Sequence, residues 1–249
     1  MIIVKSATEI QKIAHACHIV AEVLEGLKGY IIEGMSTADI ESFVDQGISK
    51  RGAKAAFRGY RGYPSSACIS VNEQVIHGIP CRSVRLKSGD IVGVDIGTFW
   101  DGFYGDAAVT IPVGDVKTEN ARLLKVTEEA LMLGIAKAVA GNRVGDISAA
   151  IQGHVEKHGY SVVRAFVGHG IGRSLHEEPQ VPNYGRAGQG PRLREGMTLA
   201  IEPMVNAGSS DIRILNDGWT AVTSDGSWSA HFEHTIAITK EGPKILTKI

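Results

Sequence analysis

Ile91-Val92-Gly93-Val94-Asp95-Ile96-Gly97 is the stretch on which the fold depends, because it places a carboxylate inside an apolar, β-branched run. Gly105-Asp106-Ala107 repeats the pattern eleven residues after Asp95, and a hairpin would set the two acids side by side. Asp95 alone is more typical of a strand end or a turn. A buried carboxylate, however, is costly unless it has a partner, a hydrogen-bond network or a metal. The pair therefore favours one of these three arrangements.

Two glutamates extend the pattern into the second half of the chain. Glu202 lies in Leu199-Ala200-Ile201-Glu202-Pro203-Met204, and Glu233 lies in Ala230-His231-Phe232-Glu233-His234-Thr235-Ile236. Each glutamate is expected within an apolar strand, so four acids in four strands need a common explanation. A structural protein with buried ion pairs is one alternative, but it would need four matching cations on strands that offer none.

His169 completes the candidate metal ligands. It stands in Val167-Gly168-His169-Gly170-Ile171-Gly172, where the glycines let other groups approach the backbone. Two Asp, two Glu and one His suit a pair of divalent ions such as Co, Mn, Fe or Zn. Sites of this kind hold a hydroxide between the two metals and hydrolyse their substrates.

The order of predicted elements in the first half recurs in the second half. Apolar periodicity and turn residues predict helices over 8–29, 37–51 (capped by Ser36), 118–139 and 146–158, and strands over 67–71, 91–96, 162–167, 197–201 and 232–238. A shift of 107 residues aligns Gly34, Asp39, Ile40, Lys50 and Gly52 with Gly141, Asp146, Ile147, Lys157 and Gly159, and Asp95 with Glu202. We interpret this as an internal duplication. Residues 1–249 then form a single catalytic domain, with halves of about 1–113 and 114–249 that share a central cleft.

Composition narrows the class of protein. Of the 249 residues, 43% are hydrophobic and 21% charged, and the formal net charge is −1. These values are ordinary for a globular domain and predict neither a nucleic-acid nor a membrane surface. No apolar run approaches the roughly 20 residues that span a bilayer, and the start is too polar for a signal peptide. Three cysteines without a C-x-x-C pair favour a reducing compartment, so we expect a cytoplasmic protein.

Other catalytic motifs are incomplete. His176-Glu177-Glu178-Pro179-Gln180 begins like H-E-x-x-H but lacks the second histidine, and the glycines of 168–172 miss the G-x-G-x-x-G spacing. No Walker-type Gly-Lys-Ser/Thr or G-x-S-x-G motif is present. An attacking water is therefore preferred to a nucleophilic side chain.

An ordered series of short motifs extends over nearly the whole chain. It comprises Gly59-Tyr60-Arg61-Gly62-Tyr63-Pro64, Cys68-Ile69-Ser70-Val71-Asn72-Glu73, His77-Gly78-Ile79-Pro80, Val94-Asp95-Ile96-Gly97, Gly105-Asp106, Gly168-His169-Gly170-Ile171-Gly172, His176-Glu177-Glu178-Pro179, Ile201-Glu202-Pro203 and Phe232-Glu233-His234-Thr235. Each motif is weak alone, but their combination resembles the methionine aminopeptidases, in particular the short bacterial type 1 form.

The resemblance implies a fold and a reaction. The fold would be the α/β (α+β) pita-bread fold, in which helices cover a central curved antiparallel sheet built from two pseudo-symmetric halves. The enzyme would be a metalloaminopeptidase that removes the N-terminal methionine from nascent proteins and peptides, preferring a small second residue. A monomer is the family default, and transient association with the ribosome is a further expectation.

The resemblance also implies roles for individual residues. Asp95 would bind one ion, His169 and Glu202 the other, and Asp106 and Glu233 would bridge both. Glu202 would also carry the proton of the attacking water. The resemblance assigns His77 and His176 to substrate contact and to the scissile carbonyl or tetrahedral intermediate.

A pocket for the methionine side chain is implied as well. It would comprise Tyr60, Tyr63, Cys68, Leu175 and Trp219, together with His77 and His176, and aromatic rings and a thiol suit a thioether. Phe57 stands where a cysteine is found in the family, and Leu175 where a phenylalanine is common. Both departures remain apolar, so they affect pocket shape. The alternatives are an X-Pro aminopeptidase or prolidase of the same fold, and a non-catalytic peptide-binding relative.

Overall fold

The computed structural model describes residues 2–249 and contains four α-helices. These are α1 (Ala7–Lys28), α2 (Thr37–Lys50), α3 (Thr118–Lys137) and α4 (Val144–Lys157). Ser6 and Ser36 cap α1 and α2, and in each case the third helical residue returns an acidic side chain to the serine N–H. The predicted Ser36 cap is confirmed. The predicted helix boundaries agree with the structure to within two residues.

The strands are short except for one hairpin. They are β1 (Lys54–Ala55), β2 (Cys68–Val71), β3 (Gln74–Ile76), β4 (Ile91–Trp100), β5 (Phe103–Pro112), β6 (Ser161–Val162), β7 (Gly168–Gly170), β8 (Glu177–Val181), β9 (Thr198–Ile201), β10 (Met204–Asn206), β11 (Ile212–Ile214), β12 (Ala221–Thr223), β13 (Ser229–His231), β14 (His234–Thr239) and β15 (Gly242–Ile245), with a 3-10 turn at Tyr60–Gly62. Every pairing between these strands is antiparallel.

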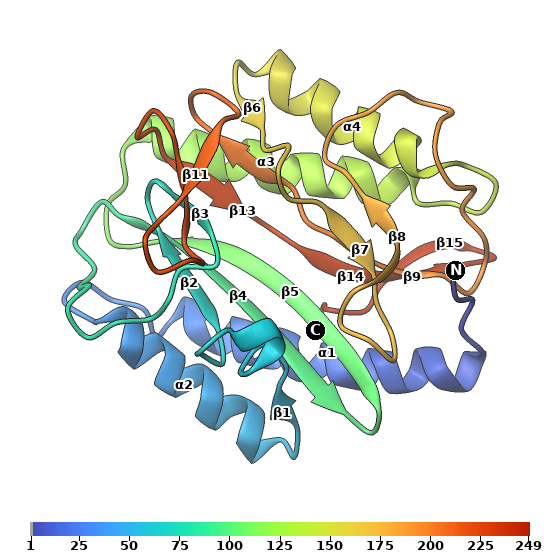
Figure 1. The fold of residues 1–249 in the computed structure, drawn as a ribbon, viewed down its shortest axis with the longest axis horizontal. Helices are drawn as coiled ribbons and strands as arrows, with labels where there is room; N and C mark the ends of the chain where they lie inside the picture. Colours follow the sequence, from blue (N-terminus) through green and yellow to red (C-terminus); the bar gives the residue numbers. More distant parts are fainter. Residues whose placement is uncertain (1) are drawn as a thin grey trace.

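The strands form the inner layer and the helices the outer one. In Figure 1, α1 and α2 lie below the strands and α3 and α4 lie above them. The first half contributes the sheet of β1, β4, β2 and β5, and the second half contributes the sheet ordered β15-β14-β9-β7-β8. A separate hydrophobic core lies beneath each pair of helices, because α1 and α2 pack with the first sheet and α3 and α4 with the second. The fold class predicted from the sequence is confirmed.

Two helix-and-loop segments, 34–52 and 141–159, have the same local structure at a shift of 107 residues. Each contains a helix of 14 residues, α2 or α4. Gly34 and Gly141, which precede these helices, both have positive φ, a conformation that favours glycine. The matching contacts are the hydrogen bonds of Gly34 N–H to Leu86 O (2.8 Å) and Gly141 N–H to Leu193 O (3.0 Å), and the bridges Ser36–Arg85 and Arg143–Arg192.

Three strand predictions require correction. The strand predicted over 162–167 ends at Val162, and the apolar residues beyond it form irregular backbone. Glu202 and Glu233 were predicted inside strands, but each lies in a two-residue interruption, between β9 and β10 or between β13 and β14. Of the four acids predicted within strands, Asp95 and Asp106 are the two that lie there.

None of the helices in residues 2–249 is both long enough and apolar enough to cross a bilayer.

Candidate metal centre and adjoining cavity

The β4–β5 hairpin places the two aspartates on one face. Asp95 pairs with Ala108, and Asp106 pairs with Gly97. Paired residues share a face and alternate residues return to it, so Asp95 and Asp106 are diagonal neighbours. The juxtaposition predicted from the sequence is confirmed.

The interruptions in the second half place the two glutamates opposite each other. Ile201 pairs with His234 and Met204 pairs with His231, so residues 202–203 face residues 232–233 across the gap. The Glu233 N–H leaves its own sheet and donates to Ala108 O of β5 at 2.9 Å. This bond brings the glutamates against the face that carries the aspartates.

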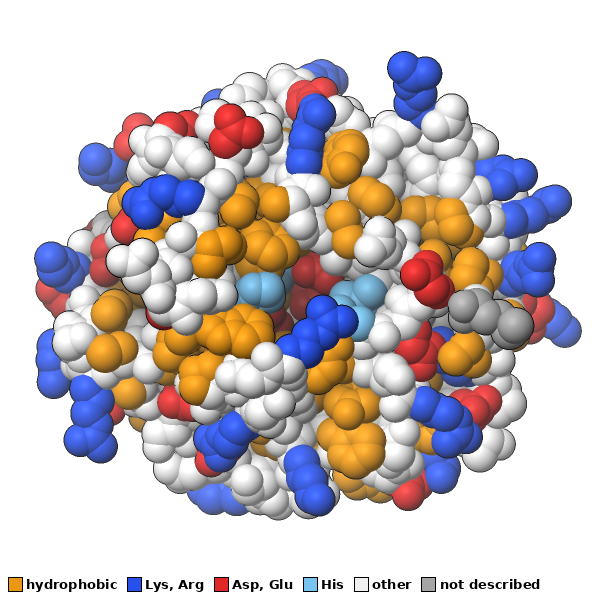
Figure 2. Space-filling view, in the orientation of Figure 1, with side chains coloured by type: hydrophobic (Ala, Val, Ile, Leu, Met, Phe, Trp, Pro, Cys, Tyr) orange, Lys and Arg blue, Asp and Glu red, His pale blue; other side chains and the backbone are white. Residues whose placement is uncertain are grey.

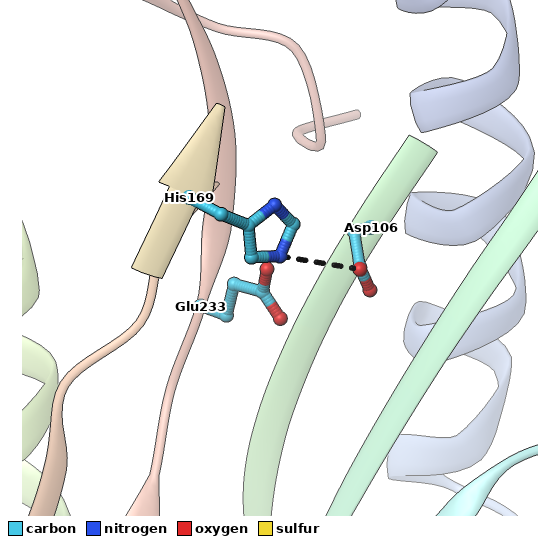
Figure 3. Close-up of side chains that lie close together, drawn as sticks. All are labelled: Asp106, His169 and Glu233. Atoms are coloured by element: carbon cyan, nitrogen blue, oxygen red, sulfur yellow. Dashed lines mark ion pairs between the residues drawn. The ribbon is translucent and has the colours of Figure 1, made fainter. Parts of the chain in front are cut away.

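His169 enters the same space from β7. Its Nδ1 lies 2.9 Å from Gly170 O, which indicates an Nδ1–H donor and leaves the Nε2 lone pair free to bind a cation. Nε2 lies 3.5 Å from Glu202 Oε1 and 4.0 Å from Asp106 Oδ2. Figure 3 shows His169 of β7, Asp106 of β5 and Glu233, from the interruption between β13 and β14, close to one another. One ligand atom from each of these three residues lies within 4.8 Å of the other two.

The charges at this centre are uncompensated. Burial raises the pKa of Asp95 to about 7, and burial together with the neighbouring acids raises the pKa of the other three carboxyl groups well above their ordinary range. Burial lowers the pKa of His169 to about 4, so its imidazole is neutral near pH 7. Within residues 2–249, no Lys or Arg forms an ion pair with these acids.

The donor atoms fit a divalent cation. Asp95 Oδ1, Asp106 Oδ1 and Glu233 Oε1 are buried without any hydrogen-bond partner in the described part of the chain. Buried polar atoms normally have partners, and oxygen-rich sites with one imidazole suit divalent ions of the first transition series. The chemistry of the five predicted ligands therefore fits a divalent metal ion.

An apolar cavity adjoins the acids. Figure 2 shows a hollow in which acidic and histidine side chains are framed by hydrophobic ones. The cavity is lined by all five candidate ligands and by Phe57, Tyr60, Arg61, Tyr63, Cys68, Ile76, His77, Leu175, His176 and Trp219. Every site residue predicted from the sequence thus lies around one space.

The pocket wall next to the acids is apolar. Cys68 pairs with Asp95 across β2 and β4, and burial raises the pKa of its thiol, which is therefore neutral. The Tyr63 hydroxyl lies within hydrogen-bond distance of Ala67 O (3.1 Å) and Gly78 O (2.9 Å). Its proton is therefore directed to the backbone, and the ring is the part of Tyr63 that lines the cavity. The Tyr63 ring meets Trp219 edge-on, with centroids 5.2 Å apart.

The two other histidines flank the cavity. His176 Nδ1 lies 2.8 Å from the Tyr60 hydroxyl, and its ring lies 4.2 Å from that of His169, centroid to centroid. His77 has a positive φ of 59° and packs edge-on against Phe166 and Trp219. Loss of water around the rings lowers the pKa of His77 to about 4 and that of His176 to about 3. Both are neutral hydrogen-bonding groups near pH 7.

Sequence reasoning missed His231. Its buried Nε2 lies 3.7 Å from Glu202 Oε2 and has no hydrogen-bond partner within residues 2–249. Burial lowers the pKa of His231 to about 3. The available signal was its position two residues before Glu233 in the same apolar run.

Four buried carboxylates and a neutral imidazole beside an apolar cavity define the centre of a metal-dependent hydrolase. The model of metallopeptidase family M24 matches residues 11–240. The chain is 51% identical to a methionine aminopeptidase of Clostridium perfringens over 249 residues, which is 100% of both proteins. It superposes on the crystal structure of a methionine aminopeptidase from Thermotoga maritima with a TM-score of 0.99 and 49% identity, covering 100% of both chains. The chain therefore belongs to metallopeptidase family M24 and, within it, to the methionine aminopeptidases.

A more distant structure shares the fold. The prolidase from Pyrococcus horikoshii superposes with a TM-score of 0.80 and 26% identity, and the match covers 99% of this chain and 63% of that one. The fold alone does not separate the two kinds of enzyme, whereas the identity over the full length does.

Proposed function

We propose that this chain is a metalloaminopeptidase that hydrolytically removes the N-terminal methionine from nascent proteins and peptides. One observation carries the proposal: a pocket of aromatic rings, a neutral thiol and Leu175 opens directly onto the five candidate ligands. An unbranched, polarizable thioether suits such a pocket. The peptide bond after the first residue would then lie at the metal centre.

We further propose that the centre binds two divalent ions, chosen from Co, Mn, Fe and Zn. Asp95 would hold one ion, and His169 and Glu202 the other. Asp106 and Glu233 would be shared, which their closeness to His169 supports. Bound ions would polarise the scissile carbonyl and lower the pKa of a water molecule.

The chain's own residues would perform the remaining steps. The pocket would hold the methionine side chain away from water, and the carboxylates would receive its positively charged amino group. Glu202 would take a proton from the attacking water and deliver it to the leaving amine. His176, whose Nδ1 lies against the Tyr60 hydroxyl, has Nε2 left to contact the carbonyl oxygen, and His77 would contact the substrate beside it.

The setting of the enzyme is also proposed. We infer that residues 1–249 act as one monomeric catalytic domain in the cytoplasm, on the N-termini of newly made chains that have a small second residue. The free Cys17, Cys68 and Cys81 are consistent with a reducing compartment. Size-exclusion chromatography with light scattering tests the monomer, and cosedimentation tests transient binding to ribosomes.

The decisive experiment is methionine release from Met-Ala-Ser by metal-stripped protein, with and without added Mn²⁺. Leu-Ala-Ser and Ala-Pro-Ser are the control substrates. Metal-dependent cleavage confined to Met-Ala-Ser is expected. Cleavage of Ala-Pro-Ser alone would assign the chain to the proline-directed enzymes instead, and no cleavage of any peptide would favour a peptide-binding role.

A further inference from the structure

His231 faces the carboxylate on which the proposed reaction depends. It is the last residue of β13, and its side chain is buried. Its Nε2 lies 3.7 Å from Glu202 Oε2, without a hydrogen-bond partner among residues 2–249. Because buried polar nitrogens normally have partners, this arrangement requires an explanation.

The two oxygens of Glu202 face different histidines. Oε1 lies 3.5 Å from His169 Nε2, and the bond from His169 Nδ1 to Gly170 O leaves that Nε2 as a lone pair. A carboxylate oxygen and an imidazole lone pair at this distance suit a metal ion bound by both. Oε2 faces His231, whose Nε2 is free to carry a proton. The carboxylate thus has one edge for a metal and one edge for a donor.

The backbone of His231 is fixed on both sides. Its N–H donates to Thr110 Oγ1 at 3.0 Å, and the Thr110 hydroxyl donates to its carbonyl at 2.8 Å. Met204 pairs with it across the sheet. Since Thr110 belongs to β5, the first half of the chain holds the main chain of His231 in place.

Another buried side chain holds the main chain of Glu202. Asn183 Nδ2 donates to the Glu202 carbonyl at 3.1 Å and leaves the carboxylate oxygens free. In the part of the chain that the structure describes, no hydrogen bond reaches either carboxylate oxygen, and His231 Nε2 is the nitrogen that faces Oε2.

We propose that His231 is a positioning residue that donates Nε2–H to Glu202 Oε2 and keeps Oε1 turned toward the metal centre. The inference rests on the proposed function, in which Glu202 is both ligand and proton carrier. Donation to a carboxylate is charge-assisted, and such bonds shorten when the site is filled. A partner of this kind orients a metal ligand without touching the metal itself.

Three variants separate donation from packing. His231→Gln retains an N–H donor of similar reach, His231→Asn retains an amide that is too short to reach Oε2, and His231→Leu removes the donor. His154→Leu is the matched control, because His154 Nε2 lies 3.0 Å from the Glu129 carboxylate on the surface between α3 and α4. Mn²⁺ affinity is measured by calorimetry on metal-stripped protein, and kcat and KM are measured with Met-Ala-Ser.

Loss of the donor should weaken Mn²⁺ binding and lower kcat. The Leu and Asn variants should each lose about 10- to 100-fold in both quantities, with little change in KM. The Gln variant should restore both to within about threefold of the parent, and the His154 control should match the parent. Parental values in the Leu and Asn variants would overturn the proposal, and so would an equal loss in all three variants. Failure of the proposed function would show as absent methionine release by the parent, which leaves the Mn²⁺ comparison intact.

Discussion

In the first half of the chain, Asp95 and Asp106 lie within strands that pair without interruption along the hairpin. In the second half, Glu202 and Glu233 lie where both partner strands are interrupted. The helix-and-loop segments 34–52 and 141–159, by contrast, keep the same hydrogen bonds at a constant shift. Local structure is therefore repeated where it is remote from the cavity and differs where the halves meet.

The cause of the interruption lies in a few backbone groups. Pro203 has no N–H to donate, and its carbonyl accepts from Phe232 N–H at 3.4 Å. The next N–H, of Glu233, donates to Ala108 of the other half. Two glutamates can thus leave their own sheet and face the aspartates. A regular ladder would have sent alternate side chains to opposite faces.

The largest effect is expected at Glu202, the counterpart of Asp95 at the shift of 107. Glu202→Ala should reduce kcat on Met-Ala-Ser by at least about 1,000-fold in Mn²⁺, because a ligand and a proton carrier are lost together. The metal-free variant should melt no lower than the parent, because burial and the neighbouring acids Asp95 and Asp106, which raise the pKa of this carboxyl group, also make its charged form unfavourable in the folded protein. Near-normal turnover would contradict the assignment of both roles.

Two glycines should give opposite changes in stability. A Cβ at Gly105 would lie 2.5 Å from Cys17 N of α1, so Gly105→Ala should cost about 1–3 kcal/mol or more. At Gly153 on α4 a Cβ meets nothing within 4 Å, and Gly153→Ala should stabilise by about 0.5–1 kcal/mol. Urea unfolding measures both. Equal changes in the free energy of unfolding of the two variants would show that the hairpin does not pack on α1 as tightly as described.

The helix caps provide a smaller difference between the halves. Ser36 is buried and caps α2 with its side chain, so Ser36→Ala should cost about 1 kcal/mol. Arg143, at the matching position before α4, lacks a side-chain cap bond, and Arg143→Ala should cost less than about 0.5 kcal/mol. Thermal unfolding of the two variants measures both losses of stability. A greater loss of stability in Arg143→Ala than in Ser36→Ala would contradict the prediction.

The smallest effect should depend on pH. Asp146 accepts hydrogen bonds from Arg143 N–H and Gly188 N–H, which lower its pKa below the ordinary 3.8. A lowered folded-state pKa means that the stabilisation is complete above pH 3.8 and is lost as pH falls through the folded value. Asp146→Asn should therefore unfold earlier in urea at neutral pH than the parent, and the two proteins should converge in acid. A difference in stability between the two proteins that does not change with pH would contradict a contribution from the ionised Asp146 carboxylate.

Local features were the most predictable from the sequence. Ser36 marks the start of a helix, and Asp95 and Asp106 lie on the two strands of one hairpin. Residues close together in the sequence are sufficient to indicate the helix cap and the hairpin. Residues 163–167 show the limit, because an apolar run indicates burial without specifying a hydrogen-bonded partner. Glu202 and Glu233 line the cavity with the other predicted ligands, but the local structure predicted for them was wrong, because the interruption depends on pairing across the fold.

The cavity depended on contacts between distant residues. Its pocket joins Tyr63, Cys68, Leu175 and Trp219, and these were expected because of a family resemblance rather than a local pattern. His231 had no motif of its own, and only the distance to Glu202 makes its position meaningful. The spacing of residues along the chain does not predict a contact such as that between His231 and Glu202.

Three consecutive contacts join residues 231–235 to β5. His231 and Thr110 exchange hydrogen bonds, Glu233 N–H donates to Ala108 O, and the Thr235 hydroxyl donates to Asp106 O. During its own synthesis, the chain must be made as far as Thr235 before all three contacts can form. The four carboxyl groups can therefore come together only after strands from both halves of the chain have been made.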